Sequence, residues 1–322
     1  MLAAKGGGLN SKRHKLGALY FLISGVVFIG AVSQLIVGVF LFGTGPDLES
    51  TANYLFCCAI AALSVWFFRR GLRATQPSAE DVLQEDERPP VLYLRSFEHD
   101  SQTRAVSDHK LGMPDFLPDP RAEDTIAPLL NTLGPMIALG RPGEKLPETG
   151  AYRLYVNDDE RRDKVRELLA KAKLVVLLAD AETADALWEV QTCLEMLRPE
   201  QLVLYFPFKP KVQEQVYSRF RDATRTYFPK ALPENLDDGV FMKFGENWSP
   251  QLVHGTSKNR AKSDYEALLK IVSDLTPNFK PPSSWSLLST PKKFAIIGIA
   301  LIWFVGIVAI IYFGLRGLMN DI

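Results

Sequence analysis

The sequence predicts an α/β domain with a doubly wound parallel sheet, attached to three transmembrane helices. Three stretches of mostly apolar residues carry no charge, at 16–43, 51–68 and 294–315. A helix needs about 20 such residues to cross a bilayer. Between the second and third stretches, short apolar runs alternate with helical patterns. Runs that are apolar throughout indicate a parallel sheet covered by helices on both faces.

Lysine and arginine flank the three stretches on one predicted side of the membrane. Positively charged flanks tend to stay in the cytoplasm. The basic residues before the first stretch, after the second and before the third are Lys5, Lys12, Arg13, Lys15, Arg69, Arg70, Arg73, Lys292 and Lys293. The turn at 44–50 carries only acidic charges. We therefore expect a multi-pass protein of the inner (plasma) membrane, with the α/β domain in the cytoplasm.

Two alternatives concern the first two stretches. A signal peptide would have an apolar core of about 7 to 15 residues, about half the length of the first stretch. The second stretch is strongly apolar only over 54–68, which at about 1.5 Å per residue is shorter than a ~30 Å hydrocarbon core. A re-entrant hairpin therefore remains an alternative to a second full span.

These patterns divide the chain into seven parts. They are a basic N-terminus at 1–15, a two-helix hairpin at 16–73, a linker at 74–90, the α/β domain at 91–276, a second linker at 277–293, a third span at 294–315 and an external tail at 316–322.

Composition excludes several classes of partner for the soluble part. Residues 74–291 contain 34 acidic and 27 basic residues, whereas nucleic-acid binding needs clustered cations. The three cysteines have no metal-binding or disulfide spacing, and the four histidines are scattered. We expect no nucleic acid, no metal and no cofactor.

Strands and helices alternate along the domain. The expected parallel strands are 91–96, 135–140, 173–179, 201–207 and 240–244. The expected helices, recognised by apolar residues at helical spacing, are 123–133, 158–172, 183–197, 211–226 and 261–275. The segment 98–121 is long for a connection in a compact domain, and such loops often form lids or binding loops.

Three motifs in this order resemble the TIR (Toll/interleukin-1 receptor) domain, in particular bacterial membrane-anchored TIR-like proteins. VLYLRSF at 91–97 resembles the first TIR strand, the loop 141–152 stands where that family has its BB loop, and KLVVLLADAETADALWEV at 173–190 resembles the strand and glutamate-bearing helix of its active site. The resemblance implies a flavodoxin-like sheet in the order 2-1-3-4-5 and homo-oligomers formed through the α/β domain. Many TIR domains place the glutamate four residues after a tryptophan, whereas Trp188 and Glu189 are adjacent here.

The geometry of the sheet predicts a binding site independently of this resemblance. Doubly wound sheets bind ligands beyond the carboxyl ends of the strands where strand order reverses, here between the first and third expected strands. The first strand ends at Arg95, Ser96 and Phe97, and the helix after the third carries Trp188 and Glu189. The apolar stripe of that helix is expected at Leu187, Val190, Leu194 and Leu197, which leaves Trp188 and Glu189 for the crevice.

A carboxylate beside an aromatic ring suits cleavage of a glycosidic bond, because the transition state resembles a cation. By the resemblance, the substrate would be NAD, and the protein would act in defence or stress signalling. Glu189 would be catalytic, with Glu195 as the alternative, and Arg95, Ser96, Phe97 and Trp188 would bind substrate. Two other readings are a non-enzymatic adaptor or nucleotide sensor and a nucleoside deoxyribosyltransferase-like enzyme.

Overall fold

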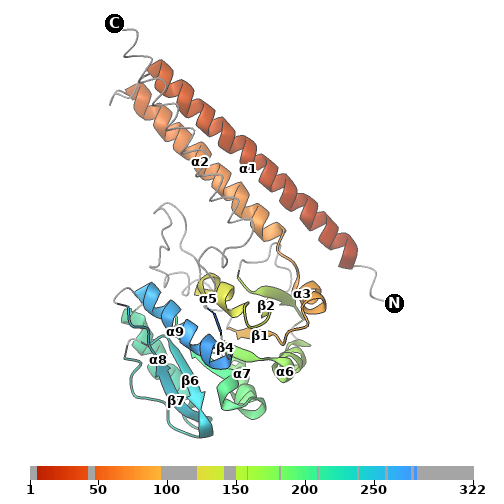
Figure 1. Ribbon diagram of the computed structural model, residues 1–322, viewed down its shortest axis with the longest axis vertical. Helices are drawn as coiled ribbons and strands as arrows, with labels where there is room; N and C mark the ends of the chain where they lie inside the picture. The colour runs from red at the N-terminus through yellow and green to blue at the C-terminus, as the bar shows by residue number, and fades with distance from the viewer. Residues whose placement is uncertain are drawn as a thin grey trace. The chain divides into compact units, whose positions relative to one another are not determined.

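The computed structural model comprises a helical hairpin and an α/β domain (Figure 1). It describes residues 6–42, 48–95, 122–140, 150–157, 159–180, 183–208, 210–237, 239–257, 260–276 and 279–280. The expected third span at 294–315 and the long loop 98–121 lie outside these ranges.

The hairpin helices pack through a seam of small residues. Helix α1 spans Gly6–Phe42 and α2 spans Leu48–Ala74. Buried small residues recur every seven positions on both helices, at Gly17, Ser24, Ala31 and Gly38 and at Cys57, Ser64 and Gly71. Such residues let two helix backbones approach closely. At the centre of the seam, the Ser24 and Ser64 hydroxyls each donate to the other residue's carbonyl at 2.9 Å.

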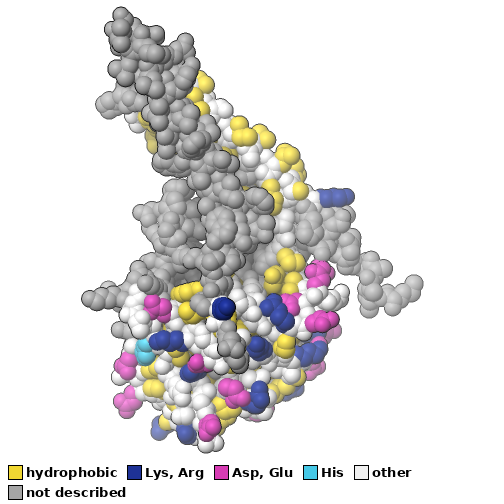
Figure 2. All heavy atoms as spheres, in the orientation of Figure 1, with side chains coloured by type: hydrophobic (Ala, Val, Ile, Leu, Met, Phe, Trp, Pro, Cys, Tyr) yellow, Lys and Arg dark blue, Asp and Glu magenta, His cyan; other side chains and the backbone are white. Residues whose placement is uncertain are grey.

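Two helical segments are long and apolar enough to cross a membrane by length and composition, Lys15–Gly38 and Thr51–Gly71. Less than a fifth of each hydrophobic window is buried within the structure. Hydrophobic side chains predominate along the visible face of the hairpin, whereas charged side chains are spread over the α/β domain (Figure 2). The second segment belongs to a continuous helix of 27 residues, so the hairpin contains no re-entrant break within α2.

The α/β domain is built on one seven-stranded, mostly parallel sheet in the order β3-β2-β1-β4-β5-β6-β7. The strands are β1 (Val91–Leu94), β2 (Met136–Gly140), β3 (Tyr152–Tyr155), β4 (Leu174–Leu178), β5 (Leu202–Tyr205), β6 (Phe241–Gly245) and β7 (Ser249–Val253). Strands β1 to β5 are parallel, and β6 and β7 are antiparallel to their neighbours.

The expectation of five parallel strands is corrected in three ways. Strand β3 lies within the segment expected to be a loop, β6 is antiparallel rather than parallel, and β7 extends the sheet beyond β6. The five expected strands do lie in the expected order relative to one another. With β3 at the edge, the parallel strands follow the 3-2-1-4-5 order of dinucleotide-binding sheets rather than the flavodoxin-like order.

Helices cover both faces of the sheet. Helices α6 (Arg161–Lys171), α7 (Ala184–Met196) and α8 (Pro210–Thr224) lie side by side on one face, and α5 (Ala122–Leu130) and α9 (Arg260–Leu275) contact each other on the opposite face (Figure 1). Their bounds match the expected helices within three residues. A short additional helix, α3 (Ala79–Glu85), lies within the expected linker 74–90 and packs beside β3.

Candidate functional site

Strand order reverses between β1 and β4, as expected. The chain places β2 and β3 on one side of β1 and β4, β5, β6 and β7 on the other. Arg95 directly follows β1, and Asp180 stands two residues beyond β4. Asp180 is buried and the Arg95 side chain is only 9% exposed. Charged groups are thus held at the two strand ends where ligands of such sheets bind.

Helix α7 begins at this edge of the sheet. The Thr183 side chain caps it by accepting a hydrogen bond from the Ala186 backbone N–H at 3.0 Å. Such caps replace one of the hydrogen bonds that the first turn lacks. The cap fixes the start of α7 close to the end of β4, and Glu189 follows about one and a half turns later.

The buried face of α7 differs from the expected stripe. Glu189, Val190, Thr192 and Cys193 are buried, whereas Leu187 and Leu194 are only partly buried. Glu189, 3% exposed, therefore lies within the packed face of the helix rather than on its flank. The adjacent Cys193 is a buried thiol, and burial raises its pKa above the usual range.

The partner of Glu189 is Arg161, at the start of α6. Arg161 Nη2 donates to Glu189 Oε1 at 2.7 Å. Burial raises the pKa of Glu189 above its usual value, and the nearby Arg161 guanidinium opposes that shift. The direction agrees with the general rule that burial disfavours the charged form of a carboxyl group.

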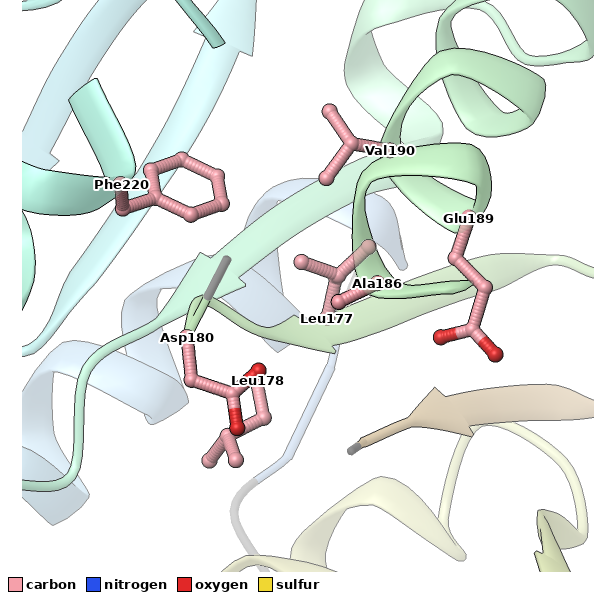
Figure 3. Close-up of a pocket in the computed structure, with 7 residues that line it drawn as sticks. All are labelled: Leu177, Leu178, Asp180, Ala186, Glu189, Val190 and Phe220. Carbon is pink, nitrogen blue, oxygen red and sulfur yellow. The ribbon is translucent and has the colours of Figure 1, made fainter. Parts of the chain in front are cut away.

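Glu189 and Asp180 both line one depression at the carboxyl end of β4. The other lining residues are Leu177, Leu178, Ala186, Val190 and Phe220. In Figure 3 the Glu189 carboxylate points away from Val190 and Phe220, and Asp180 projects from the end of β4. The space between these side chains has no room for a water molecule. Two acidic residues thus contribute to the lining of a closely packed, mainly apolar depression.

Trp188 does not line this depression. Its ring lies close to two guanidinium groups of α6, with Arg162 at 5.0 Å and Arg166 at 5.6 Å from the ring centroid. Arg162 also donates to Asp185 at 2.9 Å. Trp188 packs partly buried against the core. The arginines at the start of α6 therefore contact α7 through three acidic or aromatic residues, Asp185, Trp188 and Glu189.

A second buried charge cluster lies on the opposite face of the sheet. Glu123 Oε2 accepts from Arg153 Nη2 at 2.7 Å and lies 3.7 Å from Arg95 Nη1. Glu123 Oε1 accepts from the Ala151 backbone N–H at 2.7 Å. One carboxylate thus joins α5, the end of β1 and the start of β3. Arg95, expected to contact substrate, is held at this cluster.

The remaining predicted site residues, Ser96 and Phe97, lie outside the described residues, as does most of the loop 141–152 that was compared with the BB loop. Glu195, the alternative catalytic residue, is exposed on α7 and hydrogen-bonds to Gln191 at 3.0 Å. Within the described ranges, no group of three or more His, Cys, Asp or Glu side chains is arranged to hold a metal ion.

Sequence reasoning missed four charged residues of this region: Glu123, Arg153, Arg161 and Asp180. Asp180 carried a usable signal, since it ends an apolar run where a parallel strand delivers its carboxyl end. The other three form their ion pairs only in the folded structure, and no pattern in the sequence indicates these pairs. Comparisons with family models, with curated proteins and with solved structures gave no match.

Proposed function

We propose that the protein is a membrane-anchored, TIR-like effector that binds NAD at the carboxyl ends of β1 and β4 and cleaves its nicotinamide glycosidic bond. One observation carries the proposal: Glu189 and Asp180 border the same depression at the point where strand order reverses. The strand order of nucleotide-binding sheets adds a likeness at the level of the fold. The sequence after β1 has no G-x-G-x-x-G motif, so side chains rather than a glycine loop would hold the phosphates.

The chemistry assigned to Glu189 is stabilisation of the developing ribose cation as nicotinamide leaves. An ionised carboxylate in a closely packed site acts more strongly than it would in water. Arg161 favours that ionised form against the effect of burial. NAD binding requires the depression to open, and the ribose would then share the Glu189 carboxylate with Arg161.

The test uses the full chain in lipid nanodiscs, with release of nicotinamide from NAD as the readout. Glu189→Gln keeps the size of the side chain and removes its charge, so the rate should fall by roughly a hundred- to a thousandfold. Glu195→Gln, on the exposed face of the same helix, is the matched control and should cleave at the wild-type rate. Equal rates for wild type and Glu189→Gln would show that Glu189 is not the catalytic residue.

The membrane part of the proposal rests on the hairpin. Its two helices leave large apolar side chains exposed, and lipid would cover them. The positively charged flanks favour a cytoplasmic position for the α/β domain. In intact cells whose native cysteines are replaced, a cysteine at position 50 should react with an external, membrane-impermeant thiol reagent, and one at position 283 should not. External labelling at position 283 equal to that at position 50 would overturn this topology.

A second function, a non-enzymatic adaptor or nucleotide sensor that self-associates, is favoured by one specific contact. The Arg161–Glu189 pair can serve to hold α6 against α7 without any substrate, and side chains leave no room for a water molecule in the depression. The adaptor would bind NAD or another nucleotide without consuming it. Nucleotide binding measured by calorimetry on nanodiscs, with no release of nicotinamide, would select this function over the enzyme.

A further inference from the structure

Three side chains converge near one end of the hairpin. Arg70 Nε donates to the Tyr20 hydroxyl at 3.1 Å. The Arg70 guanidinium carbon also lies 4.9 Å from the centroid of the Trp66 ring and 5.8 Å from that of Tyr20. We call Tyr20, Trp66 and Arg70 the aromatic clamp. It joins α1 to α2 with one cation and two amphipathic rings.

Each member of the clamp has an apolar body and a polar tip. Tyrosine and tryptophan are enriched where the hydrocarbon core meets the headgroups, and arginine near a helix end extends its charged group toward water. Trp66 is 49% exposed, so a face of its indole is open to the surroundings of the hairpin. One turn beyond it, Arg69 is exposed, and Lys15 is exposed one and a half turns before Tyr20.

Helix lengths measured from the clamp match the thickness of a bilayer. From Phe21 to the end of α1 at Phe42, the chain rises about 33 Å at 1.5 Å per residue. From Ser50, which follows the exposed Glu49 in the first turn of α2, to Val65, the chain rises about 24 Å. These two lengths bracket the ~30 Å hydrocarbon core. If the clamp stands at one boundary, the connection between the helices stands at the other.

We propose that the aromatic clamp lies in the phospholipid headgroup region and sets the depth of the hairpin in the membrane. The inference rests on the proposed membrane attachment and adds a position and a lipid contact to it. The hydrocarbon core then runs over 21–42 and 50–65, which on the side of the basic flanks is about one turn less than the charge-free stretches suggest, and Glu49 lies at the opposite boundary. Leu16 and Leu19 fall among the headgroups, and Lys15 and Arg69 face lipid phosphates.

Fluorescence quenching by brominated phosphatidylcholines tests this depth with the full chain in liposomes. The difference in emission between the wild-type and Trp66→Phe chains isolates the signal of Trp66. It should be quenched most by bromines near the headgroup and least by bromines near the bilayer centre. The added substitution Ile29→Trp, nine residues beyond Tyr20 on an exposed face of α1, should show the opposite order.

The outcomes separate the inference from the membrane attachment. If neither Trp66 nor the introduced tryptophan is quenched at any depth, the hairpin is not in the bilayer and both fail. If the introduced tryptophan is quenched deeply and Trp66 equally deeply, the membrane attachment stands and the position of the clamp is wrong. Arg70→Leu should move Trp66 deeper, whereas Arg69→Leu should not; equal shifts would overturn the role of the clamp.

Discussion

Arg161 Nη2 on α6 lies 2.7 Å from Glu189 Oε1 on α7, and this pair joins two neighbouring helices across a packed interface. Glu189 is almost fully buried and Arg161 is 17% exposed, so the arginine reaches the surface while the carboxylate does not. Because a buried carboxylate needs a partner to remain charged, Arg161 controls the charge of the proposed catalytic group.

Replacing Arg161 by glutamine should raise the pKa of Glu189 further. Burial already raises this pKa, and Arg161 is the main group that lowers it. A carboxyl group with a raised pKa stabilises the fold below its unfolded value, near 4.5, and this stabilisation is lost as the pH rises through the folded value. The stability of Arg161→Gln relative to wild type should therefore fall from acid to neutral pH, where the loss approaches roughly 3 kcal/mol.

Two measurements check this prediction without any assay of activity. Carbon-13 NMR of labelled glutamate gives the Glu189 titration directly, and chemical denaturation at several pH values gives the stability difference. Arg162→Gln, which removes an exposed arginine one residue away, is the control and should leave the Glu189 titration nearly unchanged. A Glu189 pKa that stays constant in Arg161→Gln would show that other groups stabilise the carboxylate.

Trp188→Ala should act mainly on stability. Its ring packs against the core and lies close to the Arg162 and Arg166 guanidinium groups. Truncation should cost roughly 2 kcal/mol, and a double-mutant cycle with Arg162→Gln should give a coupling of about 0.5 to 1 kcal/mol. If Trp188 instead stacked on substrate, the variant would weaken NAD binding without loss of stability, and calorimetry together with denaturation distinguishes the two.

Patterns local to the sequence predicted the alternation of strands and helices, because each buried strand is apolar on both faces. Strand β3 is an exception to this pattern and was not predicted. Its sequence, YRLY, places a buried arginine, Arg153, on this edge strand, where Glu123 from α5 neutralises it. Such a pairing between residues 30 positions apart cannot be read from one sequence. The direction of β6 also depends on its tertiary partners β5 and β7, since strands toward the edge of an otherwise parallel sheet can be antiparallel.

The sequence predicted the point where strand order reverses, but not the surroundings of the residues proposed for the site. The strand ends at Arg95 and Asp180 follow from sheet topology, which the order of the elements suggested. The burial of Glu189 was missed because a charged residue interrupts the apolar period of α7, so the pattern appeared to be rotated toward Leu187. The buried face became recognisable only with Arg161 opposite the glutamate.

Glu123→Gln should destabilise the α/β domain strongly. The carboxylate receives hydrogen bonds from Arg153 and from the Ala151 backbone, and its loss leaves a buried guanidinium without that countercharge. Removing one partner of a buried ion pair costs roughly 3 to 5 kcal/mol. Urea denaturation of the full chain in detergent measures the loss. The exposed Glu195→Gln is the control and should change stability by less than about 0.5 kcal/mol; similar losses in both would contradict a special role for Glu123.

The two adjacent cysteines of α2 provide a matched test of the hairpin seam. Cys57 is buried in the row of small residues and Cys58 is exposed. Leucine at position 57 would have to fit where the helices approach closely, and overpacking of this kind costs about 1 to 3 kcal/mol. Leucine at position 58 would extend an apolar surface that, among the residues the structure describes, is exposed. Unfolding in increasing SDS, followed by circular dichroism, should therefore begin at a lower SDS concentration for Cys57→Leu than for wild type. Cys58→Leu should begin to unfold at the same SDS concentration as wild type.

If both variants unfold at the same SDS concentration, the spacing of small residues every seven positions does not determine how α1 and α2 pack. Polar contacts such as Ser24 with Ser64 hold the hairpin together instead.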